Sequence, residues 1–250
     1  MLISPPFGGG RAPVLARNTV ASSQPLATQA GIEAMQNGGN AVDAALATAI
    51  TLTVVEPTMN GLGGDGFTIL WDGKKLHGLN ASGRAPAAWK PKYFAGKSAM
   101  DLIGWNTVTV PGMVAGWVDL SRKFGKLPFA QLFKRAIDYA ENGFPVSPVI
   151  ARQWREAIPI LKNQPGFSES FLIDGKSPQA GQIWKYPAQA KTLKEIAATE
   201  GESFYKGPLA QSMVDFAQST GGCFTMQDFA DNQSEWVEPL AFDYGDYTLH

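Results

Sequence analysis

One run of apolar residues constrains this chain more than any other stretch. Residues 41–55, AVDAALATAITLTVV, place small and branched apolar side chains on nearly every side of a helix, which predicts burial on most sides. Asn40 is placed to cap this helix, and the Asp43 carboxylate can accept from the backbone N–H of the cap. Pro57 ends the helix. We therefore expect a central helix with the remaining chain packed around it.

A glycine-rich turn and two strands are predicted after this helix. The turn GLGGDG occupies residues 61–66, and residues 67–71 are typical of a buried strand. Asp72-Gly73 is a two-residue hairpin signal that returns the chain through residues 74–80. A phosphate-binding loop runs from strand to helix, whereas here a helix comes first. We interpret the glycines as close helix-to-strand packing with positive φ angles, and Asp65 as a turn residue.

Further elements are expected on both sides of this core. A short strand is predicted over residues 14–22, followed by a helix that Ser23 caps, with Pro25 in its first turn and Gly38 beyond its end. Proline and glycine punctuation predicts later helices at 111–124, 128–142, from 148 onward with a bend or end at Pro159, 187–200, 207–219, and a short one capped by Thr225 and Asp228.

The order of these elements suggests one domain. Residues 1–12 are rich in proline and glycine and are predicted to be a flexible arm. Residues 13–250 divide into core strands and buried helix (13–88), a helical layer (89–233) and a return strand (234–250). The final segment resembles a hairpin and would leave a strand edge unpaired, which compact domains avoid. We infer that more polypeptide belongs here, covalently or as a second chain.

Composition excludes several classes of function. The chain has 21 Lys plus Arg against 22 Asp plus Glu and no basic run, so neither nucleic acid nor an anionic membrane is an expected partner. One cysteine, Cys223, and two distant histidines, His77 and His250, predict no disulfide, no metal site and no complete catalytic triad. We expect no cofactor. The first residues lack a signal-peptide pattern, so a cytoplasmic location is predicted.

Several segments, taken in order, resemble one enzyme family. They are GGNAVDAA (38–45), GLGGDGF (61–67), GRAPAAW (83–89), VPGMVAGW (110–117), ENGFPVS (141–147) and EPLAFDYGDY (238–247). As a set these segments are similar to the large-subunit region of the γ-glutamyltransferase (γ-glutamyltranspeptidase) family.

The resemblance implies a fold and a chemistry. The fold is α+β, an N-terminal-nucleophile hydrolase built as an αββα sandwich, in which two central sheets are flanked by helices. Family members are made as a zymogen that cuts itself before a threonine, and this threonine becomes the nucleophile, with its own α-amine as base. That threonine would lie beyond residue 250, so we expect no catalytic residue in this chain.

The resemblance also implies two substrate-binding candidates. In the family an arginine shortly before an Ala-Pro pair holds the substrate α-carboxylate, and a guanidinium suits this because it binds both oxygens. Aligning Ala85-Pro86 with that pair puts Ser82 at the arginine's position and Arg84 two residues later. Arg84 could reach the same pocket or form a structural ion pair. This departure resembles the branch with oxamate amidohydrolase and cephalosporin acylase.

The resulting functional hypothesis is the large-subunit portion of a γ-glutamyltransferase-like acyltransferase or amide hydrolase. It would cleave or transfer the acyl group of γ-glutamyl or related small acidic amides, as in glutathione metabolism. Its partner would be a small subunit or C-terminal segment that carries the threonine nucleophile. The first alternative is an oxamate-type or other small-amide amidohydrolase. The second is a non-catalytic relative that serves binding or assembly.

Overall fold

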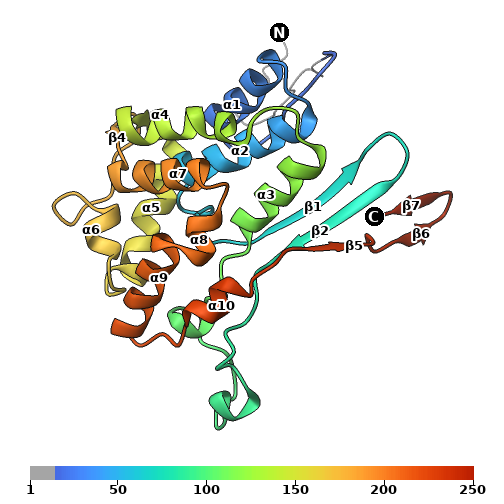
Figure 1. Cartoon of the computed structure of the whole chain (residues 1–250). Helices are drawn as coiled ribbons and strands as arrows, with labels where there is room; N and C mark the ends of the chain where they lie inside the picture. Colours follow the sequence, from blue (N-terminus) through green and yellow to red (C-terminus); the bar gives the residue numbers. More distant parts are fainter. Residues whose placement is uncertain (1–14) are drawn as a thin grey trace.

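The computed structural model describes residues 15–250, so the predicted arm at 1–12 lies outside the described residues. Figure 1 shows the helices gathered on one side and the long strands extending from them on the other. The α-helices are α1 (Pro25–Gln36), α2 (Ala41–Val55), α3 (Met113–Phe124), α4 (Lys134–Asn142), α5 (Pro148–Leu161), α6 (Phe167–Phe171), α7 (Pro187–Ala198), α8 (Glu202–Lys206), α9 (Pro208–Ser219) and α10 (Met226–Ala230).

The strands form one three-stranded sheet and two small ribbons. They are β1 (Gly66–Trp71), β2 (Leu76–Ala81), β3 (Phe144–Pro145), β4 (Ile183–Trp184), β5 (Glu235–Val237), β6 (Phe242–Tyr244) and β7 (Tyr247–Leu249). The sheet has the antiparallel order β1-β2-β5, while β3 pairs with β4 and β6 with β7. Its outer strand β1 therefore has no strand partner on one side among the described residues.

The start of α2 confirms the predicted cap. The Asn40 Oδ1 accepts from the backbone N of Val42 (2.9 Å) and Asp43 (3.1 Å), and the Asn40 N–H donates to Asp43 Oδ2 at 2.8 Å. Asp43 is fully buried and also accepts from the backbone N–H groups of Lys126 and Leu127. One carboxylate thus caps α2 and binds the segment after α3.

A face of small residues lets α1 pack closely on α2. Ala27, Ala30, Gly31 and Ala34 are buried. A methyl group on Gly31 would lie 2.3 Å from Thr48 Oγ1 and 2.9 Å from the Ala44 carbonyl, so the helices approach too closely for any side chain there. The apolar faces of α2, α4 and α7 continue this core.

The predicted hairpin forms, but with a longer loop and one open face. Trp71 pairs with Leu76, so four residues rather than two connect β1 and β2. The strand was also expected to be buried, and this is wrong, because the side chains of β1 alternate between partly buried and exposed. Phe67 is 70% exposed and Trp71 62%, since no described residues cover that face of the sheet.

Three further expectations differ from the structure. Residues 15–22 form no strand, because no neighbouring strand lies beside them. Gln24 rather than Ser23 caps α1, and the Ser23 hydroxyl instead donates to Glu56 Oε2 at 2.6 Å. Gly63 and Gly64 have no positive φ, and a methyl group on Gly63 would meet nothing within 4 Å, whereas one on Gly64 would lie 3.2 Å from Met113 Cε on α3, as close packing requires.

Helices α3 to α10 lie within residues 113–230, with the short strands β3 and β4 among them. The segment after Pro128 begins as a 3₁₀-helix (Phe129–Phe133) before α4, and further 3₁₀ turns occupy Pro91–Phe94 and Trp105–Thr107. Pro159 lies inside α5. Thr225 and Asp228 form the predicted capping box of α10. No helix among residues 15–250 is long and apolar enough to cross a membrane.

Tyr205 fixes the start of α3 against α8. Its hydroxyl donates to the Pro111 carbonyl at 2.8 Å and accepts from the Ala115 N–H at 3.0 Å. Burial raises the pKa of this phenol, so the hydroxyl stays protonated and can donate. Gly112, the residue before α3, has no side chain to cap the helix. The Tyr205 hydroxyl instead accepts from the Ala115 N–H in the first turn of α3.

The segment after β2 packs closely against the segment before α3. Gly83 has φ 78°, and a methyl group there would lie 1.8 Å from the Val110 carbonyl oxygen. The Val110 N–H donates to the Arg84 carbonyl at 2.9 Å, which ties residues 83–84 to residue 110. Glycine is required here both for the backbone conformation and for the space.

We predict that Asp43→Ala lowers the free energy of unfolding by at least about 3 kcal/mol, because three backbone N–H groups lose their acceptor. Urea unfolding followed by circular dichroism measures this change. Asp215→Ala is the matched control, since this exposed carboxylate on α9 binds one glutamine side chain. A loss for Asp43→Ala no larger than for the control would contradict the central role of the carboxylate.

We predict that Gly83→Ala destabilises the fold more than Gly96→Ala. Both glycines have similar φ angles, 78° and 84°, but a methyl group on Gly96 would meet nothing within 4 Å. The two substitutions therefore share the backbone strain and differ in overpacking, which costs about 1–3 kcal/mol. Thermal melting of both variants tests this, and equal melting temperatures would show that residues 83 and 110 do not pack as described.

Candidate functional site

The turn after β2 carries both substrate-binding candidates, Ser82 and Arg84. The Asn80 Oδ1 accepts from the Ser82 N–H at 3.0 Å, and the Thr109 hydroxyl donates to the Ser82 carbonyl at 3.4 Å. Further along, the Ala87 N–H donates to Asp228 Oδ1 at 2.7 Å. The turn is therefore held at both ends by hydrogen bonds to its backbone, which leaves its side chains free for other contacts.

Arg84 forms a single exposed ion pair. Its Nη2 lies 3.2 Å from Glu235 Oε1 on β5, and the two side chains are 57% and 58% exposed. Ion pairs with this exposure contribute about 0–1 kcal/mol, because water competes for both charges. The guanidinium can thus exchange this partner for another carboxylate at little cost. The Ser82 hydroxyl makes one long contact, 3.4 Å to the Gly83 carbonyl.

A groove of about 760 Å³ runs along the free edge of β1. Its walls come from α2, α3, β1 and β2, and its lining includes Ala45, Ala49, Phe67, Leu79, Ala81, Met113 and Trp117. Figure 1 shows β1 as the outer strand of the long hairpin, with α2 and α3 on the helical side. Because Gly66 pairs with Ala81, this groove ends next to Ser82.

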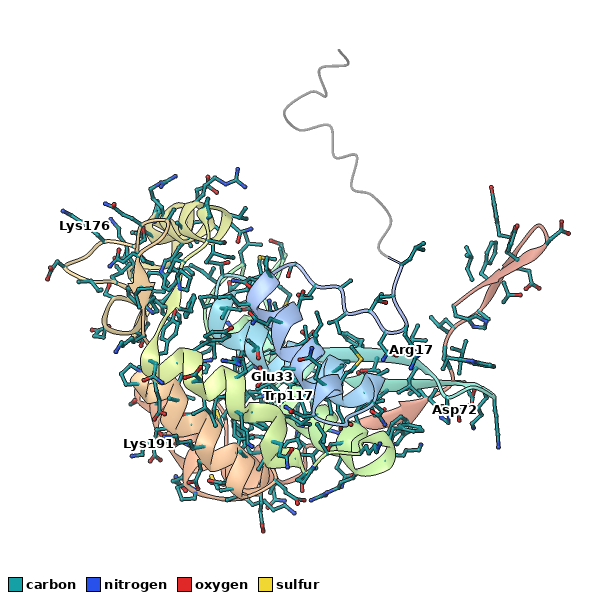
Figure 2. All side chains as sticks on the ribbon, turned by 90° about the horizontal axis from the view of Figure 1, so that it is seen from above. Arg17, Glu33, Asp72, Trp117, Lys176 and Lys191 are labelled. Carbon is teal, nitrogen blue, oxygen red and sulfur yellow. The ribbon has the colours of Figure 1, made fainter. Side chains whose placement is uncertain are left out.

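His77 belongs to a cluster near the end of the hairpin that Asp72 marks in Figure 2, and two members of this cluster, Asp72 and Phe124, also line the groove. Its Nε2 lies 2.7 Å from Asp72 Oδ2, and its ring meets those of Phe124 and Trp236 edge-on. This histidine and the N–H groups of residues 74 and 75 hold the pKa of Asp72 well below its usual range. Among the described residues, the His77 ring packs against these aromatic rings and pairs with the Asp72 carboxylate, and it makes no hydrogen bond to a hydroxyl group.

Sequence reasoning missed two residues that shape the turn. Asp228 was recognised as a helix cap, but its contact with Ala87 joins residues 141 positions apart. Glu235 stands beside Arg84 because β5 pairs with β2, and Asn80 is its register partner. Neither contact has a local sequence signal, since both depend on the chain returning to the sheet after the helical layer.

A family model and curated relatives of this chain agree with one another. The family model described as gamma-glutamyltranspeptidase matches residues 27–250. The glutathione hydrolase-like YwrD proenzyme of Bacillus subtilis is 37% identical over 94% of this chain and 45% of its own length. The oxamate amidohydrolase proenzyme of Klebsiella pneumoniae is 36% identical over 90% of this chain and 44% of its own. The chain thus spans less than half the length of these two relatives.

Solved structures share the fold. Gamma-glutamyltranspeptidase from Pseudomonas nitroreducens, complexed with L-DON, superposes with a TM-score of 0.87 at 33% identity, over 94% of this chain and 71% of that one. Cephalosporin acylase from Bacillus halodurans gives 0.86 at 41% identity, over 97% of this chain and 48% of that one.

These likenesses confirm the predicted fold class, an α+β N-terminal-nucleophile hydrolase. Within residues 15–250 the structure presents one sheet of that fold and the helices on one of its faces. The match of the family model over residues 27–250 and the relatives above 30% identity agree with each other. The chain therefore belongs to the gamma-glutamyltranspeptidase family.

Proposed function

We propose that this chain is the large-subunit portion of an amidohydrolase that cleaves or transfers the acyl group of γ-glutamyl or related acidic amides. The observation that carries the proposal is the family match over residues 27–250. A threonine outside residues 1–250 attacks the amide carbonyl, the amine leaves, and water or a second amine then takes the acyl group. The cytoplasmic location stays a prediction.

The groove beside β1 is the proposed docking place for the polypeptide that carries this threonine. The edge of β1 has backbone groups free to pair with an added strand, and the adjoining face exposes Phe67, Ile69 and Trp71. The two relatives described above are more than twice as long as the matched region, so those proteins contain enough further polypeptide to cover such a face. We therefore assign the groove to the small subunit or C-terminal segment of the same protein.

The position of the turn supports a role in binding the acid. A strand added along β1 has one end near Gly66, which pairs with the residue before Ser82. An N-terminal threonine at that end lies beside the turn, and the Arg84 guanidinium can then hold the carboxylate of the substrate. The weak pair with Glu235 is the resting contact that this carboxylate replaces.

A small-amide amidohydrolase is the second candidate function. The oxamate amidohydrolase relative is 36% identical, and Arg84 stands two residues from the position at which the family places its arginine. A displaced guanidinium favours a shorter acid than glutamate, so we expect oxamate to compete with γ-glutamyl substrates. A non-catalytic binding or assembly role is the remaining alternative, and a complete protein without turnover of either amide would favour it.

We predict that residues 1–250 alone show no amidase activity and tend to aggregate. They lack the nucleophile of the proposed mechanism, and the apolar face of β1 is open to water. Turnover of a chromogenic γ-glutamyl anilide and of oxamate measures activity, and light scattering measures aggregation. Turnover by this polypeptide above the uncatalysed rate would contradict the proposal.

The docking face can be tested separately in the complete protein. Ile69→Asp should prevent assembly with the nucleophile-bearing polypeptide, because a charge would enter the proposed apolar contact. Ile160→Asp on α5 is the matched control, since the two isoleucines are 57% and 60% exposed. Co-purification of the two polypeptides, or solubility of the single precursor, is the measurement. Equal behaviour of the two variants would remove the docking assignment.

We predict that Arg84→Ala lowers kcat/KM for an acidic amide by about 10- to 150-fold, the cost of a lost charge-assisted contact. The methyl ester of the same substrate should lose far less. Arg84→Lys should also be impaired, because an ammonium group cannot bind two carboxylate oxygens as a planar fork. Equal losses on acid and ester would make Arg84 a structural residue.

Glu235→Gln separates the two roles of Arg84. If the guanidinium holds substrate, removing its resting partner should leave kcat/KM for the acid unchanged or higher. If the ion pair is structural, Glu235→Gln and Arg84→Ala should cause similar losses of activity and of melting temperature. Comparing both variants on acid and ester therefore decides between the clamp and the structural pair.

A further inference from the structure

A second hollow lies on the far part of the helical layer, between α5 and the loop that precedes β4. Its volume is about 440 Å³. Arg152 and Arg155 stand three residues apart on α5, so they lie on the same side of the helix. Lys176 faces them from the loop, and Figure 2 shows it at the edge of the molecule among other nitrogen-tipped side chains.

These three cations have no acidic partner within residues 15–250. Arg84, Arg122 and Arg135 all form ion pairs elsewhere in the structure. By contrast, the side chains of Arg152, Arg155 and Lys176 take part in none of the ion pairs or hydrogen bonds of the described chain, and no aspartate or glutamate lines the hollow. The acids nearest in sequence, Glu156 and Asp174, neither line it nor pair with these cations. All the charged side chains that line the hollow are therefore positive, which favours an anionic ligand.

The floor of the hollow is apolar. It is formed by Ala151, Ile158 and Pro178, and two of these residues, Ala151 and Pro178, are buried. A cationic rim over an apolar floor complements a ligand that has an apolar body and an anionic group. The volume falls within the range of small-ligand pockets, about 300–1,000 Å³. Two guanidinium groups suit phosphate or carboxylate oxygens because each presents parallel N–H donors.

We propose that this hollow binds a small organic anion with an apolar body and a phosphate or carboxylate group. The site uses α5 and the following loop, and shares no residue with the Ser82–Arg84 turn or the groove beside β1. It is independent of the proposed amide chemistry. Binding there can be measured whether or not the complete protein hydrolyses an amide.

Isothermal titration of the purified complete protein with three matched probes tests the chemistry. The probes are 1-naphthyl phosphate, 1-naphthoate and 1-naphthol, which share the apolar body and differ in charge. We expect both anions to bind and 1-naphthol to show no saturable heat, with weaker binding of the anions at higher salt. Tighter binding of the phosphate would identify a phosphate-bearing ligand, and equal binding would identify a carboxylate as sufficient. Equal binding of 1-naphthol, or no binding of either anion, would overturn the proposal.

Substitutions test whether Arg152 and Arg155 bind the anion. Arg152→Gln and Arg155→Gln should each weaken binding of the preferred anion about tenfold, as expected for one charge-assisted contact. Lys191→Gln is the control, because Lys191 is an exposed cation on α7 that Figure 2 places well away from Lys176. Circular dichroism should show unchanged melting, since all three side chains are exposed. Unchanged affinity in both arginine variants would refute the site.

Discussion

The fold depends on one buried carboxylate. Asp43 accepts from the N–H groups of residues 40, 126 and 127, so it joins the start of the central helix to the segment that follows α3. Asn40 completes the junction from the other side by donating to the Phe124 carbonyl. Four polar backbone groups that would otherwise be buried without partners are satisfied in this way. The junction fixes α3 relative to α2, and the groove beside β1 lies between these two helices.

Local sequence signals predicted most of the helices. They failed where a segment's structure depends on a packing or pairing partner that is distant in the sequence. Asn40, Pro57 and the apolar run gave α2 its limits, because capping and helix termination act over a few residues. The strand over 67–71 was correctly placed, but its burial was not, since burial depends on what covers the sheet. Residues 15–22 have the composition of a strand and lack a neighbour to pair with. A sequence pattern cannot supply that neighbour.

The candidate site was predicted only where its residues are close together in the sequence. The GRAP segment located Arg84 and Ser82, because the resemblance is carried by adjacent residues. Glu235 and Asp228 reach the same turn from the far end of the helical layer. The buried Asp228 holds the backbone through a short contact, whereas Glu235 makes an exposed and weak one. The turn thus combines a backbone held by hydrogen bonds with an exchangeable side-chain contact.

The open face of β1 has a consequence for synthesis of the protein on the ribosome. Translation adds about 5–20 residues per second, so each further 100 residues takes about 5–20 s. In the proposed arrangement, Phe67, Ile69 and Trp71 emerge long before the polypeptide that covers them. During this interval the edge of β1 can pair with the same edge of a neighbouring nascent chain. The need for chaperones during synthesis should therefore rise with the length of chain that separates β1 from its covering strand. Selection can then act on the spacing between these two segments in the gene.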